Sequence, residues 1–299
     1  MKSMLEVREG LFANEAKDEN GNPLPGVMPM IKRRGCLKAL AEYTGRNTIA
    51  YYTLMGNGMI DETHVLGFVE TVDGMDPAKG LDLIIHTGGG MPTAAESIMK
   101  YLRKVFNNDI RVIVPEHAMS AGAMMALSAK EILMGRAACL GPIDAQVLVG
   151  DDRVSAFSLF REMRAAKEDM TANPATAPYW QARLEKYPAG IFNTVMDYIK
   201  HSGEVATAGL TEVMFSDGSV DANGIKKIVA AFNNTNLTHG RHIDFDQCKE
   251  IGLRVRELDE DVPMHDHVMM MHYAYILTME KDGFGTLIEG NNGRVYAGR

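Results

Sequence analysis

The sequence predicts an α/β protein with a mainly parallel sheet, a helical insertion and a C-terminal hairpin. Between residues 47 and 135, short apolar runs rich in β-branched residues alternate with stretches of helical periodicity, which is typical of a parallel sheet covered by helices. From residue 155 to residue 236 the pattern changes to long helical periodicity. The tail places Asn-Asn-Gly between two short apolar runs, as in a hairpin.

The individual elements can be predicted in chain order. Residues 1–45 are rich in Gly, Pro and charge, and we expect a loosely structured lead-in there. The predicted elements of the first half are strands at NTIAYYTLMG, GLDLIIHTGGG, IRVIVP and EILMG, and helices at residues 60–75 and 92–106, where apolar residues follow helical spacing. After the insertion, IDFDQCKEIGLRV predicts a helix capped by Asp244 and Gln247, followed by a strand. We therefore expect a core domain at residues 46–260, with the insertion at 155–236, and a helix-plus-hairpin extension at residues 261–299.

Composition excludes several classes of function. The 299 residues include 39 acidic and 31 basic residues, for a net charge of −8. Phosphate binding needs clustered Lys and Arg, so we expect no nucleic-acid partner. No apolar run is long enough to cross a bilayer, so we expect no membrane association. The three cysteines form neither a disulfide framework nor a zinc spacing, which indicates a reducing, cytoplasmic location.

Two predicted strand ends carry residues suited to acyl transfer. One strand ends in TGGG, where Gly88, Gly89 and Gly90 leave the backbone unobstructed, and Ser120 follows the next strand. Carboxyl ends of successive parallel strands meet at one edge of a sheet. The amides of Gly89 or Gly90 and of Ala121 would there receive an oxyanion while the Ser120 hydroxyl attacks a carbonyl. The alternatives are a helix cap for the serine and a tight turn or phosphate cradle for the glycines. No nucleotide motif follows the glycines, so we expect no cofactor.

The motifs TGGG, AMSAG and LGPIDAQ together resemble the serine dehydrogenase proteinase family, a distant relative of Clp-type peptidases within the crotonase-like superfamily. The resemblance covers residues 47–150 and resumes at LTHGRHIDFDQCKEIGLRV. It implies a β-β-α spiral core and a homo-oligomer. Matched residue by residue, it also implies Ser120 as nucleophile, Asp144 as acid and His239 as base. These roles fit the chemistry, because an imidazole takes the serine proton and a carboxylate orients the imidazole.

Other bases stay open at this point. His242 lies three residues after His239, and both His117 and His86 are closer to Ser120 in the sequence. The signal-peptide peptidases, which belong to the same superfamily, use a serine–lysine dyad that requires a lysine with a lowered pKa. The lysine candidates are Lys130 and Lys167; we expect the first to point away from the serine and the second to lie on a solvated helix face.

Two histidine-containing segments could be read as metal sites. HGRHIDFD contains His239, His242, Asp244 and Asp246, and HDHVMMMH contains His265, Asp266, His267 and His272. Neither has an HExxH or paired-cysteine spacing, so we expect no metal. The second segment is instead expected to be a polar helix start followed by a Met-rich buried face.

The sequence thus favours a cytoplasmic serine hydrolase, foremost a peptidase that acts on a peptide or protein substrate through an acyl-enzyme at Ser120. A homo-oligomer is expected, and an unfoldase or adaptor is a candidate partner. One alternative is a crotonase-like acyl-thioester enzyme, in which the same backbone amides stabilise an enolate. The other is a catalytically silent oligomeric scaffold.

Overall fold

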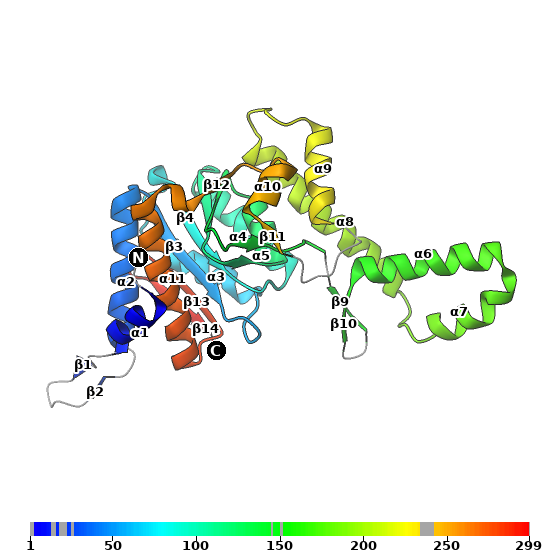
Figure 1. The fold of residues 1–299 in the computed structure, drawn as a ribbon, viewed down its shortest axis with the longest axis horizontal. Coiled ribbons are helices and arrows are strands. Elements are labelled where there is room, and N and C mark those ends of the chain that lie inside the picture. Colours follow the sequence, from blue (N-terminus) through cyan, green and yellow to red (C-terminus); the bar gives the residue numbers. More distant parts are fainter. Residues whose placement is uncertain are drawn as a thin grey trace.

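The structure is a computed structural model that describes residues 3–12, 16–17, 23–24, 27–144, 146–149, 152–233 and 242–298. Its centre is a seven-stranded sheet (Figure 1). The strands in spatial order are β12 (Val255–Glu257), β7 (Glu131–Met134), β5 (Ile110–Val114), β4 (Leu81–His86), β3 (Asn47–Thr53), β13 (Thr286–Gly290) and β14 (Val295–Gly298). The five strands from β12 to β3 are parallel, and β13 and β14 form the antiparallel C-terminal hairpin. The predicted fold class is confirmed.

Helices cover both faces of this sheet, so its central strands are buried. All seven residues of β3 are buried, and its neighbours Tyr51 and Tyr52 point to opposite faces because side chains alternate along a strand. Tyr51 belongs to the core under α3 (Thr63–Val72), α4 (Pro92–Val105) and α5 (Ala121–Leu127). Tyr52 belongs to the core under α2 (Val27–Thr44) and α11 (Val262–Asp282). The sheet therefore has an α5 face and an α11 face.

The expectation of a loosely structured lead-in was wrong for its second half. The 18-residue helix α2 packs against both α11 and β3. Helix α1 (Met4–Phe12) packs against α2 and α11. Leu37, Leu40 and Ala41 follow the i, i+3, i+4 spacing and are buried, and both leucines belong to the α11-face core. The Gly and Pro residues that suggested a loop lie almost entirely before this helix. The short strands β1 (Ala16–Lys17) and β2 (Pro23–Leu24) pair there.

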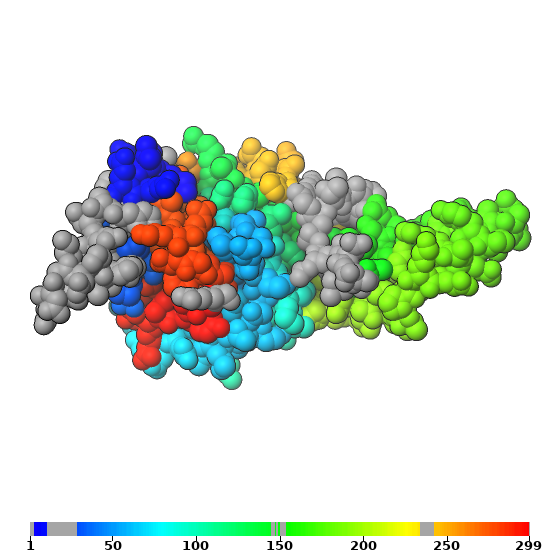
Figure 2. All heavy atoms as spheres, turned by 90° about the horizontal axis from the view of Figure 1, so that it is seen from below, coloured from blue at the N-terminus to red at the C-terminus, as the bar shows by residue number. Residues whose placement is uncertain are grey.

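The helical insertion has two parts. Helices α8 (Ile191–Gly209) and α9 (Ala222–Phe232) contribute Val205, Ala206 and Phe232 to the α5-face core. Helices α6 (Ala156–Ala172) and α7 (Ala177–Leu184) instead project from the sheet as an arm, as Figures 1 and 2 both show. A small separate core that includes Leu159 and Val195 joins this arm to α8. Within the described ranges, no helix is long and apolar enough to span a membrane.

Small strands that the sequence did not predict lie beside the main sheet. The strands β6 (His117–Ala118), β8 (Cys139–Leu140) and β11 (Ile243–Asp244) form a three-stranded sheet, and β9 (Gln146–Val149) pairs with β10 (Asp152–Ser155). After β11, α10 (Phe245–Ile251) carries the predicted capping box, in which Asp244 accepts from the Gln247 amide and the Gln247 side chain accepts from the Asp244 amide. Two-residue strands carry too little pattern to be found from periodicity.

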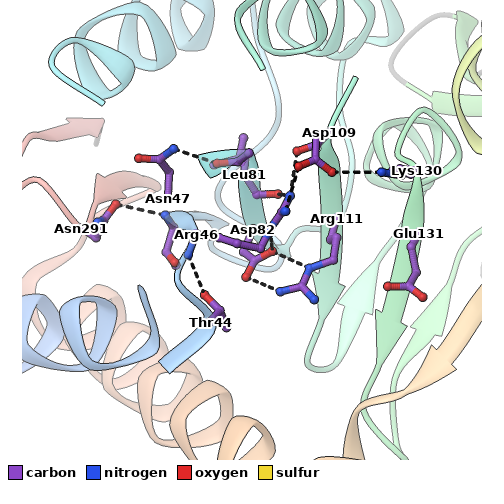
Figure 3. A network of polar contacts seen from close by, with 12 residues as sticks. Thr44, Arg46, Asn47, Leu81, Asp82, Asp109, Arg111, Lys130, Glu131 and Asn291 are labelled. Carbon is purple, nitrogen blue, oxygen red and sulfur yellow. Dashed lines mark hydrogen bonds and ion pairs between the residues drawn. The ribbon is translucent and has the colours of Figure 1, made fainter. Parts of the chain in front are cut away.

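The amino ends of the strands meet in a charge network (Figure 3). Asp82, at the start of β4, is fully buried and accepts two hydrogen bonds of 2.7 Å from Arg111 and one of 2.9 Å from Arg46. Arg46 also reaches Asp109 at 2.9 Å, and Lys130 lies 3.3 Å from the other oxygen of Asp109. Lys130 is therefore occupied at the amino edge of the sheet, opposite the edge where the strand that precedes Ser120 ends.

Candidate active site

The structure brings the two predicted strand ends together. Thr87, the residue after β4, forms a parallel bridge with Ala118, in which its amide donates to His117 (2.9 Å) and its carbonyl accepts from Met119 (3.0 Å). As a result Gly89 lies directly against Ser120. A Cβ atom built on Gly89 would lie 2.7 Å from Cβ and 3.3 Å from Oγ of Ser120. Only glycine fits at this position, which also has φ = +103°.

Ser120 lies in a strained turn between β6 and α5. Its φ of 50° and ψ of −116° lie outside the regions that a side chain with a Cβ prefers. Although it occupies the N-cap position of α5, its side chain makes no capping hydrogen bond, and it is only half-buried. The simple capping interpretation therefore does not describe this serine. A sharp turn between strand and helix that presents a serine hydroxyl is the arrangement used by many serine hydrolases.

Three backbone amides lie at the two strand ends that meet here, those of Gly89, Gly90 and Ala121. The Gly89 amide donates to the Thr87 hydroxyl at 3.1 Å, so it is engaged in this structure. By contrast, no described residue accepts a hydrogen bond from the amides of Gly90 or Ala121. Buried or half-buried amides without an acceptor are rare unless a ligand or water completes them. Gly88 is the least constrained of the three glycines, since a Cβ there would meet only Met55, at 3.5 Å.

The segment that carries Asp144 also packs against the serine turn. The Gly141 amide donates to Ala118 at 3.0 Å, and a Cβ on Gly141 would lie 2.8 Å from the Ser120 amide nitrogen. Asp144 follows three residues later and is 7% exposed. His239, the base that the resemblance implies, lies outside the described residues.

The described histidine closest to Ser120 in the sequence is His117, whose Nδ1 lies 3.1 Å from Sγ of Cys139. Its ring centroid lies 5.4 Å from that of His242, an exposed residue. Burial raises the pKa of Cys139 to about 11, so the thiol is protonated and unsuited to act as a nucleophile. The candidate Lys167 lies in the projecting helix α6.

A second polar cluster lies on the α11 face behind this edge, and of its three members only Glu116 was not singled out from the sequence. His86 pairs in register with Tyr52 and shares its face, where it meets Glu116 and His272. Burial, followed by the nearby His272 imidazole, lowers the pKa of His86 to about 3. Contact with His272 lowers the pKa of Glu116 to about 2. Glu116 belongs to no recognisable motif. The sequence could not join His272 to His86 because the partners of His272 are distant in the chain.

Comparison with known proteins matches this edge of the molecule to a family. Residues 48–172 match the model of the ClpP-like SDH-type serine proteinases. This segment of the chain is therefore similar to the ClpP-like SDH-type serine proteinases. The predicted family is thus confirmed for a segment that includes TGGG, Ser120 and Asp144, whereas His239 lies beyond it.

Two proteins similar to this chain come from Methanocaldococcus jannaschii. The uncharacterized protein MJ0137 is 29% identical over 195 residues, which is 65% of this chain and 59% of the relative. The uncharacterized protein MJ1495 is 45% identical over 67 residues, or 22% of this chain and 23% of the relative. The chain thus spans less than two thirds of either relative. Among solved structures, a serine-to-alanine mutant of the membrane-bound stomatin-specific protease 1510-N has a TM-score of 0.41 and 15% identity, over 73% of this chain and 84% of that one.

Proposed function

We propose that this chain is a serine peptidase in which Ser120 forms an acyl-enzyme with a peptide or protein substrate. The observation that carries the proposal is the conformation of Ser120. Its hydroxyl makes no capping hydrogen bond, and its backbone has a strained, positive φ. It also lies so close to Gly89 that a side chain at position 89 would clash with it. The match of residues 48–172 to the ClpP-like SDH-type serine proteinases supports the same conclusion.

The chemistry follows from the surrounding amides. Attack by the Ser120 hydroxyl on a peptide carbonyl places negative charge on the carbonyl oxygen, which needs preorganised N–H donors. The amides of Gly90 and Ala121 have no described acceptor and supply two such donors. The Gly89 amide is a third donor if it exchanges the Thr87 hydroxyl for the oxyanion.

For the base we propose His239, oriented by Asp144, as the family resemblance implies. The imidazole takes the serine proton and later donates it to the leaving amine, while the carboxylate stabilises the imidazolium. The burial of Asp144 and the packing of its segment against Ser120 support its role. His117 and His242 are the described competitors.

Fluorophosphonate labelling tests the nucleophile. Wild-type protein should take up one probe per chain, on the peptide that contains Ser120, and Ser120→Ala should take up none. Ser97→Ala, at an exposed serine in α4, is the matched control and should label like wild type. Labelling that persists in Ser120→Ala, or that never occurs in folded wild-type protein, would contradict the proposal and favour the silent scaffold.

The base is tested by comparing His239→Ala, His242→Ala and His117→Ala. Removal of a general base typically costs about 10²- to 10⁴-fold in rate. We expect this loss in the labelling rate of His239→Ala, together with loss of the histidine limb of its pH profile, and smaller changes in the other two. A full loss in His117→Ala with an active His239→Ala would reassign the base.

We also propose that the protein works as a cytoplasmic homo-oligomer fed by an unfoldase or adaptor. The exposed side chains of Tyr179 in the arm and Tyr198 in α8, at 69% and 45%, are surfaces suited to such contacts. Sedimentation of the purified protein distinguishes an oligomer from a monomer, and a monomer at micromolar concentration would contradict this part.

A further inference from the structure

Three side chains from distant parts of the sequence converge on the α11 face. His86 is the last residue of β4, Glu116 lies between β5 and β6, and His272 lies in the middle of α11. Nδ1 of His86 is 3.7 Å and Nε2 of His272 is 3.3 Å from the same oxygen, Oε2 of Glu116. One ligand atom from each residue lies within 4.8 Å of the others.

These separations fit three ligands of one shared metal ion better than they fit a set of hydrogen bonds. Tetrahedral ligands about 2.0 to 2.2 Å from a zinc ion lie about 3.3 to 3.6 Å from one another. The distance from His86 to Glu116 is too long for a hydrogen bond. The ligand types, two imidazoles and one carboxylate, are those of borderline divalent transition metals.

A second observation points to a ligand that the protein atoms do not supply. Nδ1 of His86 is buried, and among the described residues it has no hydrogen-bond partner; the whole residue is 1% exposed. Its nearest acidic atom is the Glu116 oxygen just described. A buried unpaired ring nitrogen is costly, and a bound ion would complete it.

The second shell is also in place. The Tyr52 hydroxyl lies 3.2 Å from Nδ1 of His272 and can accept a hydrogen bond from the Nδ1–H group, which leaves Nε2 free to bind a metal. Tyr52 is fully buried, so this contact fixes the orientation of the ring. The Glu116 side chain is 44% exposed and therefore gives an ion a route from solvent.

We propose that His86, Glu116 and His272 bind one divalent transition-metal ion, with zinc as the expected metal and water as its fourth ligand. Within the described residues this is the group of His, Cys, Asp and Glu side chains close enough to share an ion. The proposal is independent of the nucleophile, since none of its ligands is assigned a role at Ser120.

The position of the site suggests what the ion does. His86 immediately precedes TGGG, and Glu116 lies four residues before Ser120. An ion held between them and α11 therefore ties together the two strand ends that place Gly89 against Ser120. The ion therefore positions the residues of the proposed active site without touching it. Side chains alternate along a strand, so His86 points to the α11 face and the next residue, Thr87, points to the α5 face.

Metal analysis of the purified full chain, followed by titration of chelator-treated protein with Zn²⁺ and Co²⁺, tests the site. We expect one equivalent of zinc per chain and a visible spectrum typical of tetrahedral Co²⁺. His86→Ala and His272→Ala should lose the bound equivalent, and Tyr52→Phe should raise the Kd for Zn²⁺ by about 10- to 100-fold. Circular dichroism verifies that each variant is folded.

His265→Ala is the matched control. This histidine lies on the same helix and near two carboxylates, Asp259 at 3.7 Å and Asp266 at 3.5 Å, but outside the cluster. It should bind zinc like wild type. If chelator-treated wild-type protein binds neither ion, or if folded His86→Ala and His272→Ala keep full affinity, the site is overturned. Should both variants fail to fold, the wild-type titration and the shift in Tyr52→Phe decide.

Discussion

The two ends of the central sheet differ in how completely their polar groups are paired. At the amino end, the buried carboxylate of Asp82 receives three hydrogen bonds from Arg46 and Arg111. At the carboxyl end, Ser120 has a positive φ, and no described residue accepts from the amides of Gly90 and Ala121. The paired groups at the amino end stabilise the fold, whereas the unpaired amides at the carboxyl end are available to bind a ligand.

The comparison predicts that changes at the two ends affect different measurements. Substitutions at the amino end should lower the free energy of unfolding and leave the labelling rate of folded protein intact. Substitutions at the carboxyl end should lower the labelling rate and have a smaller effect on the free energy of unfolding. A variant that changes both equally would weaken the distinction.

The largest effect is expected for Asp82→Ala. Removing this carboxylate takes the shared partner away from the partly buried Arg46 and Arg111, of which Arg46 keeps its contact with Asp109, and breaking such buried pairs costs about 3 to 5 kcal/mol. Urea denaturation should show a loss of this size. Glu131→Ala, at the start of β7, is the control. It removes only a partly exposed ion pair with Arg256 and should cost less than about 1 kcal/mol. Equal losses in the two variants would contradict the assigned role of Asp82.

Gly89→Ala should come next, and its effect should fall on activity. The new Cβ would lie 2.7 Å from Cβ of Ser120 and 2.9 Å from the Met119 carbonyl, so the serine must move. We expect the fluorophosphonate labelling rate to fall by about 10²-fold or more, the size of effect seen when one oxyanion donor is lost. In Gly88→Ala the added atom meets only Met55 at 3.5 Å, and labelling within tenfold of wild type is expected. A slow Gly88→Ala and a fast Gly89→Ala would place the site elsewhere.

Replacement of Ser120 by glycine should reveal the strain stored at the carboxyl end. Glycine adopts φ = 50° without steric cost, so Ser120→Gly should be more stable than Ser120→Ala by about 1 to 2 kcal/mol. Both variants should fail to label. Thermal unfolding of the pair measures the difference, and an equal or lower stability of Ser120→Gly would show that the turn is unstrained.

The smallest effect concerns Asp109 and pH. Burial raises the pKa of this carboxyl, but hydrogen bonds and charge from Arg46 and Lys130 outweigh burial and hold the pKa below its ordinary value. Its contribution to stability is therefore present above the unfolded pKa of ~3.9 and is lost as the pH falls through the lower folded-state pKa. Asp109→Asn should cost less than about 1 kcal/mol at pH 7, and the cost should vanish in strong acid. A cost that grows on acidification would have the wrong sign.

The sequence was informative wherever one local pattern specified one structure. The TGGG turn, the strand NTIAYYT, the capping box at Asp244 and the Asn-Asn-Gly hairpin all follow from periodicity or from residues with special backbone preferences. The meeting of Gly89 and Ser120 was also predictable, since parallel strands must bring their carboxyl ends to one edge. The helix α2 was missed because Gly and Pro in the preceding segment masked the spacing of Leu37, Leu40 and Ala41.

By itself, then, the sequence determined the α/β class and the edge of the sheet at which Gly89 meets Ser120, the proposed nucleophile, because both depend on near neighbours in the chain. Only the tertiary structure decided that Lys130 pairs with Asp109 at the far end, that the Ser120 side chain caps nothing, and that His272 of α11 meets His86 and Glu116. Lys130 and Asp109 are 21 positions apart in the sequence, and His272 and His86 are 186 apart (272 − 86). The spacing of residues along one segment does not show which distant segment packs against it.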